Sequence, residues 1–245
     1  MPQIFKVGGC VRDELLGIQS KDIDFTFVLD DLTQSVEEGF QQMTDWMNRE
    51  GFQVFLSTPD CFTIRARFPQ DTPNKGLVAD FVMARKEIGY MEGTRRPILA
   101  LGSLEDDLLR RDFTLNALAV SEDGDLIDLF DGQKDLANRL LRTPLPAKQT
   151  MMDDPLRIMR ALRFKITKGF SISDDIWLAM MQPEILDKLR TTVSAERIRE
   201  EVLKMTKHDT AGTLRLLNLV DSKSIPGFMD LVFDRGLWLK PTFEL

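Results

Sequence analysis

Short runs in which hydrophobic and polar residues alternate dominate the first half of the chain. The apolar run at residues 4–7 predicts a strand, the two glycines at 8–9 predict a turn, and residues 11–16 predict a short helix. Residues 23–29 alternate strictly, which places their hydrophobic side chains on one face of a strand. Further strands are predicted over residues 52–56, 61–68, 77–84 and 126–130.

The middle of the chain combines one clear helix with one stretch that has no clear period. Hydrophobic residues recur at helical spacing over residues 33–49, and we expect Thr33 to cap this helix and Gly51 to end it. Its predicted core residues are Val36, Phe40, Met43 and Met47. Residues 85–97 are charged and contain glycine and proline, so we expect a mobile loop near the functional site.

The pattern becomes helical beyond Pro144 and Pro146, which indicate a domain boundary. We therefore predict an α+β protein with two domains, residues 1–143 and residues 144–245. In the second domain the Asp154-Pro155 pair predicts a helix start, with the aspartate as its cap. The basic residues of this helix, with no acid among them, are Arg157, Arg160, Arg163, Lys165 and Lys168. Later helices are predicted over residues 194–205, 210–220 and 227–233. The basic stripe in an otherwise acidic protein indicates a binding partner.

Composition limits the chemistry that the chain can perform. Its 245 residues are 43% hydrophobic and 29% charged, as in an ordinary globular protein. No apolar run approaches membrane-spanning length and no signal peptide is recognisable, so we expect a cytoplasmic protein with no membrane partner. With two cysteines and one histidine, any metal must be held by carboxylates. The net charge of −7 argues against a wholly basic surface but is compatible with a local basic groove.

The glycine turn and two nearby aspartates suggest a site for a nucleotide and a divalent cation. Backbone N–H groups of Gly8 and Gly9 converge where a phosphate can sit, and Arg12 follows three residues later. Asp22 and Asp24 project from one strand face and can share one or two divalent cations, as nucleotidyl transfer requires. Each feature alone is more often an ordinary turn or a solvated strand face, but their combination favours the functional interpretation.

Two later stretches add polar candidates to this site. Asp80 is a candidate third acid, although an edge-strand acid facing water is an equally good interpretation. Arg110 and Arg111 are candidate clamps for a triphosphate, and Asp112 or Asn116 can hydrogen-bond a ribose hydroxyl. The alternative for this second stretch is a surface helix with ordinary ion pairs.

The helix start in the second domain predicts a site that distinguishes nucleobases. Asp154 and Arg157 lie three residues apart, so a carboxylate can accept from an exocyclic amine while a guanidinium donates to a ring nitrogen. Cytosine and adenine offer that pair of partners, whereas uracil and guanine leave both protein groups unpaired, at ~1–3 kcal/mol each. Glu196, Arg197 and Glu200 can brace the basic helix, or they form intrahelical ion pairs on a solvated surface.

Six stretches, in order over residues 7 to 201, resemble one known family far more specifically together than any one does alone. It is the family of class II tRNA nucleotidyltransferases (CCA-adding enzymes) and bacterial poly(A) polymerases, within the DNA polymerase β nucleotidyltransferase superfamily. The stretches are Gly8-Gly9-x-x-Arg12-Asp13, Asp22-x-Asp24, Arg110-Arg111-Asp112-Phe113-Thr114-x-Asn116-Ala117, Asp128 to Gly132, Asp154-Pro155-Leu156-Arg157-x-x-Arg160-x-x-Arg163-Phe164 and Glu196-Arg197-Ile198-x-x-Glu201. The resemblance implies a nucleotidyltransferase head domain with a mixed sheet flanked by helices, followed by an all-helical neck and a partial body domain.

The resemblance also implies a role for each matching residue. It makes Asp22 and Asp24 the ligands of two Mg²⁺ ions. The implied nucleotide contacts are Gly9 and Arg12 at the triphosphate, Arg111 and Asp112 at phosphate and sugar, Asp154 and Arg157 at the base, and Arg160 and Arg163 near the nucleotide.

We therefore expect a template-independent enzyme that adds C and A from CTP and ATP to a tRNA 3′ end or another RNA 3′ end. The alternatives are a poly(A) polymerase, an enzyme that adds only A or only C, nucleotidylation of a small molecule, and a catalytically idle RNA-binding or nucleotide-binding module. The basic helix counts against a small-molecule acceptor, and the intact Asp22 and Asp24 count against an idle module.

Two departures from the family pattern qualify this expectation. Asp153 stands where the family usually has a glutamate before Asp154, and this shorter acid can alter how firmly Arg157 is held. The family continues into helical body and tail domains that grip tRNA. Without them we expect weak tRNA binding, a smaller RNA end, a fragment, or completion of the RNA site by a partner chain or a dimer.

Overall fold

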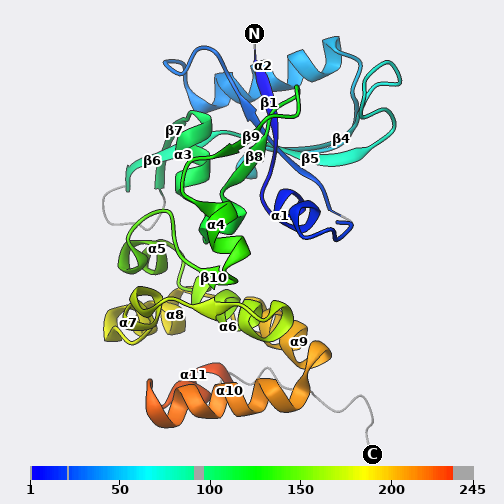
Figure 1. Ribbon diagram of the computed structural model, residues 1–245. Coiled ribbons are helices and arrows are strands. Elements are labelled where there is room, and N and C mark those ends of the chain that lie inside the picture. Colours follow the sequence, from blue (N-terminus) through cyan, green and yellow to red (C-terminus); the bar gives the residue numbers. More distant parts are fainter. Residues whose placement is uncertain (1, 21, 91–96, 234–245) are drawn as a thin grey trace, which may run out of the picture. The chain divides into compact units, whose positions relative to one another are not determined.

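The computed structural model describes residues 2–20, 22–90 and 97–233, and the chain divides into two compact units. The N-terminal unit is Met1–Lys134 and the C-terminal unit is Asp135–Leu245. Figure 1 shows a sheet with helices in the first unit and a succession of helices in the second. The predicted boundary between residues 143 and 144 stays a prediction about functional domains.

A seven-stranded mixed sheet forms the centre of the N-terminal unit. Its strand order is β3-β4-β5-β2-β1-β8-β9, and the β2–β5 pair is parallel while the other neighbours are antiparallel. The strands are β1 (Gln3–Val7), β2 (Asp24–Val28), β3 (Gln53–Thr58), β4 (Thr63–Arg67), β5 (Val78–Met83), β8 (Leu118–Val120) and β9 (Leu126–Asp128). The mixed sheet that the family resemblance implies is confirmed.

Two faces of this sheet are covered by different helices. Helix α2 (Val36–Arg49) packs its predicted core residues against one face, together with hydrophobic side chains of β2, β4 and β5 (Figure 1). On the other face Leu104 and Leu108 of α3 (Leu104–Leu109) pack against Phe5 and Val7 of β1. The remaining helical segments are α1 (Gly9–Leu15), η1 (Pro59–Cys61), η2 (Thr114–Asn116) and α4 (Gly132–Ala137), and α4 crosses the boundary between the units.

The structure corrects the predicted cap of α2 and part of the predicted loop in this unit. The cap of α2 is Ser35 instead of Thr33, because Ser35 and Glu38 form a reciprocal capping box that begins the helix two residues later. Residues 85–90 are not a loop: they form β6 (Arg85–Tyr90), which pairs with β7 (Pro97–Leu101) in a separate two-stranded sheet. The rest of the predicted loop, residues 91–96, lies outside the described residues.

The C-terminal unit is almost entirely helical. Its helices are α5 (Ala147–Asp153), α6 (Arg157–Lys168), α7 (Asp174–Met180), α8 (Pro183–Thr192), α9 (Ala195–His208), α10 (Thr210–Lys223) and α11 (Phe228–Phe233). Helix α6 packs against α9 (Figure 1). A short parallel pair, β10 (Leu140–Leu141) with β11 (Ser171–Ile172), departs from the all-helical expectation. Residues 140–141 pair as a strand because Arg139, at φ 49°, turns the chain out of α4.

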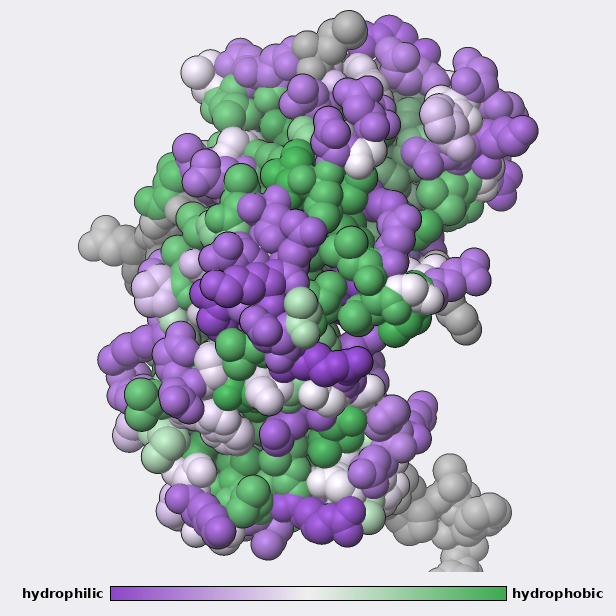
Figure 2. Space-filling model, viewed as in Figure 1, coloured by the Kyte–Doolittle hydropathy of each residue, from purple (hydrophilic) through white to green (hydrophobic). Residues whose placement is uncertain are grey.

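Hydrophilic and hydrophobic residues are interspersed over the visible surface in Figure 2. Single exposed hydrophobic side chains are common on folded proteins and need no explanation. Phe55 and Leu56 differ because they are consecutive on the edge strand β3 and are 48% and 57% exposed. Across the described ranges, we find no helix with the length and apolar character needed to span a membrane.

Candidate nucleotide and metal site

The turn after β1 places a backbone glycine directly against an arginine from a distant part of the chain. Gly8 has φ 78°, a conformation that residues with a side chain rarely adopt. A Cβ atom added there would lie 2.6 Å from Nη1 of Arg111. The amide of Gly8 donates to the carbonyl of Leu118 at 3.1 Å, which ties the turn to β8. The backbone conformation therefore favours glycine at this position, and a side chain there would displace the Arg111 guanidinium.

Gly9 is less constrained than Gly8 within the folded chain. A Cβ atom at Gly9 would meet the Arg12 guanidinium at 3.5 Å, an ordinary van der Waals contact. Among the residues that the structure describes, none gives a steric reason for glycine at this position, and the contact of Gly9 with a triphosphate stays a prediction.

Two of the three candidate metal ligands are neighbours across the sheet. Asp24 begins β2 and is paired in register with Val7 of β1 and with Asp80 of β5. Burial and the charge of Asp80 raise the pKa of the Asp24 carboxyl, the Arg111 guanidinium opposes this shift, and Asp22 adds to it. Asp22 is exposed and lies two residues before β2. The three acids therefore contribute to one local negative field.

Asp80 lies on β5, an internal strand, so the interpretation of Asp80 as an edge-strand acid is wrong. Its carboxylate lies 3.5 Å from the Arg65 guanidinium of β4. Within residues 2–20, 22–90 and 97–233, no group of three or more histidine, cysteine, aspartate or glutamate side chains is arranged to hold a metal ion. Carboxylate oxygens are nevertheless the donors that Mg²⁺ prefers, and Mg²⁺ commonly takes one or two carboxylates with the rest of its shell from phosphates and water. The donor set fits this ion.

A buried aspartate that the sequence interpretation missed holds both candidate arginine clamps. The Asp107 side chain is 1% exposed, forms an ion pair with Arg110, and accepts from Nη2 of Arg111 at 2.8 Å and from the Thr26 hydroxyl at 2.8 Å. Burial alone would raise the pKa of Asp107, but the charges of Arg111 and Arg110, with the hydrogen bonds from Arg111 and Thr26, lower it to about 2. The signal in the sequence was the i,i+3 and i,i+4 spacing of Asp107 to the two arginines.

Arg111 keeps one unused donor. Its Nε atom is buried and has no hydrogen-bond partner in the part of the chain that the structure describes, although its two Nη atoms contact Asp107, Thr26 and the carbonyl of Asn116. An unsatisfied buried donor is uncommon in folded proteins and calls for an explanation. Because the Nε atom is buried, a ligand oxygen would reach it only after a local rearrangement.

A second polar network links the helix after the glycine turn to the segment after α3. Arg12 donates to Asp13 through Nε at 2.9 Å and through Nη2 at 2.8 Å, and through Nη1 to Oδ1 of Asn116 at 2.5 Å. The Asn116 amide donates in turn to Oδ1 of Asp112 at 2.8 Å, which also accepts from the backbone of Phe113 at 2.8 Å. The structure thus brings Arg12, Asp112 and Asn116 into one hydrogen-bonded chain, and their contacts with nucleotide stay a prediction.

The predicted base-selecting residues lie at the start of α6 in the C-terminal unit. Asp154 accepts from the amide of Leu156 at 3.1 Å, but α6 begins at Arg157 and its N-cap position is Leu156, so the prediction that Asp154 caps this helix is wrong. The other carboxylate oxygen of Asp154 accepts from Arg197 of α9 at 3.1 Å, and Arg157 donates to the carbonyl of Thr150 at 3.0 Å.

Helix α9 also supplies the acid that contacts the basic helix. Glu201, which is buried, accepts from Nε of Arg163 at 2.5 Å and from Lys204 at 3.4 Å. Glu196 and Glu200 are both exposed. Glu201 therefore supports the basic helix α6 from α9. This residue belongs to the motif Glu196-Arg197-Ile198-x-x-Glu201, but a supporting role was not predicted for it. Arg160 is half-buried on the same helix α6.

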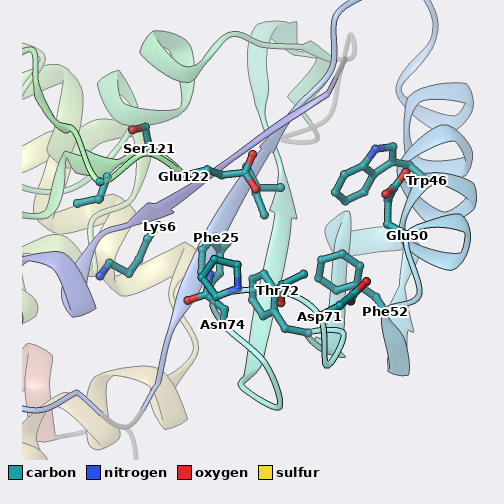
Figure 3. Close-up of a pocket in the computed structure, with 15 residues that line it drawn as sticks. Lys6, Phe25, Trp46, Glu50, Phe52, Asp71, Thr72, Asn74, Ser121 and Glu122 are labelled. Atoms are coloured by element: carbon teal, nitrogen blue, oxygen red, sulfur yellow. The ribbon is translucent and has the colours of Figure 1, made fainter.

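A cavity of about 400 Å³ lies on the α2 side of the sheet, and none of the candidate metal ligands Asp22, Asp24 and Asp80 lines it. Figure 3 shows Trp46 and Phe52 on one side of this cavity and Lys6 and Ser121 on the other. Phe25 also lines the cavity, and the alternation of β2 directs Phe25 and Asp24 to opposite faces. The candidate catalytic residues do not line this cavity.

Comparison with known proteins connects this geometry to a family. The poly(A) polymerase head domain matches residues 4–142. This range includes the glycine turn, the three candidate acids and both polar networks.

Individual relatives extend the similarity beyond the head domain. The chain is 36% identical over 222 residues to the nucleotidyltransferase lcsQ of Purpureocillium lilacinum, covering 82% of this chain and 35% of the relative. It is 35% identical over 208 residues to the mitochondrial CCA tRNA nucleotidyltransferase of Candida glabrata, covering 81% and 38%. A solved tRNA nucleotidyltransferase complexed with a primer tRNA and an incoming ATP analog has a TM-score of 0.67 and 29% identity, covering 95% of this chain and 60% of that one. The chain spans little more than a third of the length of the two sequence relatives.

Proposed function

The chain belongs to the family of the poly(A) polymerase head domain, that of the CCA-adding tRNA nucleotidyltransferases, and from this membership we propose that it extends RNA 3′ ends without a nucleic-acid template. The favoured reaction is addition of C and A, from CTP and ATP, to the 3′ terminus of tRNA. Names of the relatives support this substrate class, and the activity is a proposal because the chain spans only part of their length.

One observation carries the proposal: Asp24 lies beside Asp80 in the sheet and opposite Val7, the residue that precedes the glycine turn. Arg111, which lies against Gly8, influences the Asp24 carboxyl electrostatically. Carboxylates, a backbone turn and a guanidinium thus converge, which is the combination that a metal-bound triphosphate requires.

In the proposed reaction the terminal 3′-hydroxyl oxygen of the RNA attacks the α-phosphorus of the incoming nucleotide. A phosphodiester bond forms, the bond from the α-phosphorus to the bridging oxygen of the β-phosphate breaks, and pyrophosphate leaves while the hydroxyl proton passes to solvent. Two Mg²⁺ ions bound by Asp22 and Asp24, with Asp80 as a further ligand, would stabilise the attacking and leaving oxygens.

The protein groups have separate roles in this reaction. Gly8, Gly9 and Arg12 would hold the triphosphate, and Arg111, fixed by Asp107, would neutralise its charge. Asp112 and Asn116 would orient the ribose, while Asp154 and Arg157 would accept cytosine or adenine by the donor and acceptor pattern of their Watson–Crick edges. Arg160 and Arg163 would bind near the nucleotide, with Arg197 and Glu196 as supports.

The test is incubation of the purified chain and Mg²⁺ with a tRNA that ends at the discriminator base, with each nucleoside triphosphate supplied separately and then all together. Extension by C and then A, without U or G, is the expected result. Long A tails would instead identify a poly(A) polymerase, and extension by one nucleotide type would identify a C-only or A-only enzyme. Binding of tRNA with no incorporation, unchanged by Asp22→Ala, would overturn the proposal in favour of a binding module.

The same assay, repeated over a range of protein concentrations, tests whether a second chain is needed to complete the RNA site. If a partner chain or a dimer completes the RNA site, extension should rise more steeply than linearly with protein concentration. The cytoplasmic compartment stays a prediction, and the Candida glabrata relative is named as mitochondrial.

A further inference from the structure

A row of side chains leads from the candidate catalytic acids to the open edge of the sheet. The strand register aligns Asp24 of β2 with Asp80 of β5, Asp80 with Arg65 of β4, and Arg65 with Leu56 of β3. Residues paired in register lie on the same face of a sheet. The row therefore joins the acids to β3, which is an edge strand.

This row lies on the face opposite the α2 core. Ile64 and Ala66 of β4 are buried in that core, so Arg65 and Arg67, which alternate with them, project from the other face. The Arg65 side chain is 51% exposed and lies 3.5 Å from Asp80.

The edge of the row carries an exposed aromatic ring with a cation above it. A register shift between Val54 and Leu56 leaves Phe55 outside the regular pairing of β3 with β4. The Arg67 guanidinium lies 5.2 Å from the centroid of the Phe55 ring, and it also donates to Gln53 at 3.2 Å. We call Phe55, Leu56, Arg65 and Arg67 the edge strip.

An acidic protein that presents two arginines beside two exposed hydrophobic side chains has the chemistry of a single-strand RNA contact. Arginine attracts the phosphate backbone, and an exposed aromatic ring stacks on a base whatever its identity. The net charge of −7 makes this local arrangement contrast with the rest of the chain. Because the edge strip continues to Asp80, a bound RNA strand has a defined direction: its 3′ terminus must lie toward Asp80 and Asp24.

We propose that the edge strip binds the unpaired nucleotides that precede the 3′ end of the primer RNA, with Phe55 stacking on a base and Arg65 and Arg67 contacting phosphates. This inference rests on the proposed nucleotidyl transfer. It assigns the incoming RNA strand to the face of β4 and β3, in addition to the nucleotide contacts described above.

The test compares Phe55→Tyr, Phe55→Leu and Arg67→Gln, with Arg49→Gln on α2 as the arginine control because Arg49 is exposed and lies on a helix outside the edge strip. The probe is a 5′-labelled tRNA transcript that lacks only its terminal A. Its Kd is measured by fluorescence anisotropy, and KM and kcat for ATP addition are measured separately for RNA and for ATP.

We expect Phe55→Leu to raise the Kd and the KM for RNA about tenfold, since base–aromatic stacking is lost, while Phe55→Tyr keeps the ring and stays within about twofold of wild type. Arg67→Gln should weaken RNA binding and reduce the slope of log Kd against log salt concentration by roughly 0.7, the value for one phosphate contact to a single strand. The KM for ATP should not change in any of these variants. Circular dichroism should show the same fold throughout.

The inference is overturned if Phe55→Leu and Arg67→Gln keep the RNA Kd and KM of Arg49→Gln. It is also overturned if their main effect is on self-association, measured by analytical ultracentrifugation, because the edge would then be a protein interface. A wild-type chain that binds the probe through the edge strip but adds no nucleotide would overturn the proposed nucleotidyl transfer and leave the RNA-binding role of the edge strip standing. Loss of folding in Phe55→Leu but not in Phe55→Tyr would likewise contradict an exposed binding role for the ring.

Discussion

Substitution of Asp107 by asparagine removes a buried negative charge that contacts both Arg110 and Arg111. The Asp107 side chain is 1% exposed and accepts from Arg110, Arg111 and Thr26. Asparagine has nearly the same shape but carries no charge, so the variant isolates the electrostatic contribution. We expect it to destabilise the chain and to loosen Arg111, the candidate triphosphate contact.

The magnitude follows from the pKa of Asp107. The folded value is about 2, against a reference of 3.8 for the unfolded chain. Each unit corresponds to 1.36 kcal/mol between the two protonation states, so the carboxylate contributes roughly 2 kcal/mol to the free energy of unfolding at neutral pH. Leaving two guanidinium groups without their buried partner adds to this loss, and removal of one member of a buried ion pair commonly costs about 3–5 kcal/mol. We therefore expect a loss of about 3 kcal/mol.

The pH dependence has a definite sign. Because the pKa of Asp107 is lower in the folded state, its contribution is fully present above about pH 4 and is lost as the pH falls towards 2. Wild type should therefore lose its stability advantage over Asp107→Asn across that interval.

Urea unfolding at pH 7, 5, 4 and 3 measures both effects, with Glu105→Gln as the control because Glu105 is an exposed acid on the same helix. The difference between Asp107→Asn and the control should be about 3 kcal/mol at pH 7 and should shrink at pH 3. Equal unfolding midpoints for the two variants at pH 7 would refute the reasoning.

Three further experiments test other parts of the site. Gly8→Ala should lower the unfolding free energy by ~1–2 kcal/mol, because Gly8 has a positive φ and its Cβ position lies 2.6 Å from the Arg111 guanidinium. Gly9→Ala should unfold like wild type and raise the KM for ATP. Equal thermal unfolding of the two variants would contradict this. Glu201→Gln should cost ~2 kcal/mol in urea unfolding because it weakens a buried ion pair, while Glu200→Gln, on an exposed position, should cost under ~0.5, and similar losses would disprove the bracing role. Asp154→Ala should raise incorporation of U and G relative to C and A more than it changes nucleotide KM, and an equal loss for all four nucleotides would count against base selection.

Local patterns in the sequence were sufficient to predict much of the fold. The alternation of Ile23 to Leu29 predicts β2, and the spacing of Val36, Phe40, Met43 and Met47 predicts the buried face of α2. Such patterns depend on which face of one element is buried, so they can be recognised without knowledge of its neighbours. The cap at Ser35 was missed because Thr33 is an equally suitable residue two positions earlier, and only the reciprocal bond to Glu38 distinguishes them.

Contacts between distant segments could not be predicted in the same way. Asp80 meets Asp24 because β5 returns parallel to β2 after a long connection, and no local pattern specifies that register. The approach of Arg111 to Gly8 likewise depends on how α3 and β8 pack. The ion pairs of Asp107 could have been predicted from its spacing to Arg110 and Arg111. That spacing also fits an exposed ion pair, however, and only the burial of Asp107 distinguishes the two.

Single-turnover extension of a tRNA lacking its terminal A, with ATP and Mg²⁺, tests most directly whether the acids at the start of β2 carry the chemistry. The comparison is Asp24→Asn with Asp123→Asn, a substitution of an exposed aspartate in the turn between β8 and β9. Asp24→Asn should slow addition of A by a factor on the order of 10³ while RNA binding and thermal stability stay close to wild type, because several kcal/mol of metal-assisted stabilisation is lost. Addition of A by Asp24→Asn at the rate of Asp123→Asn would contradict the account.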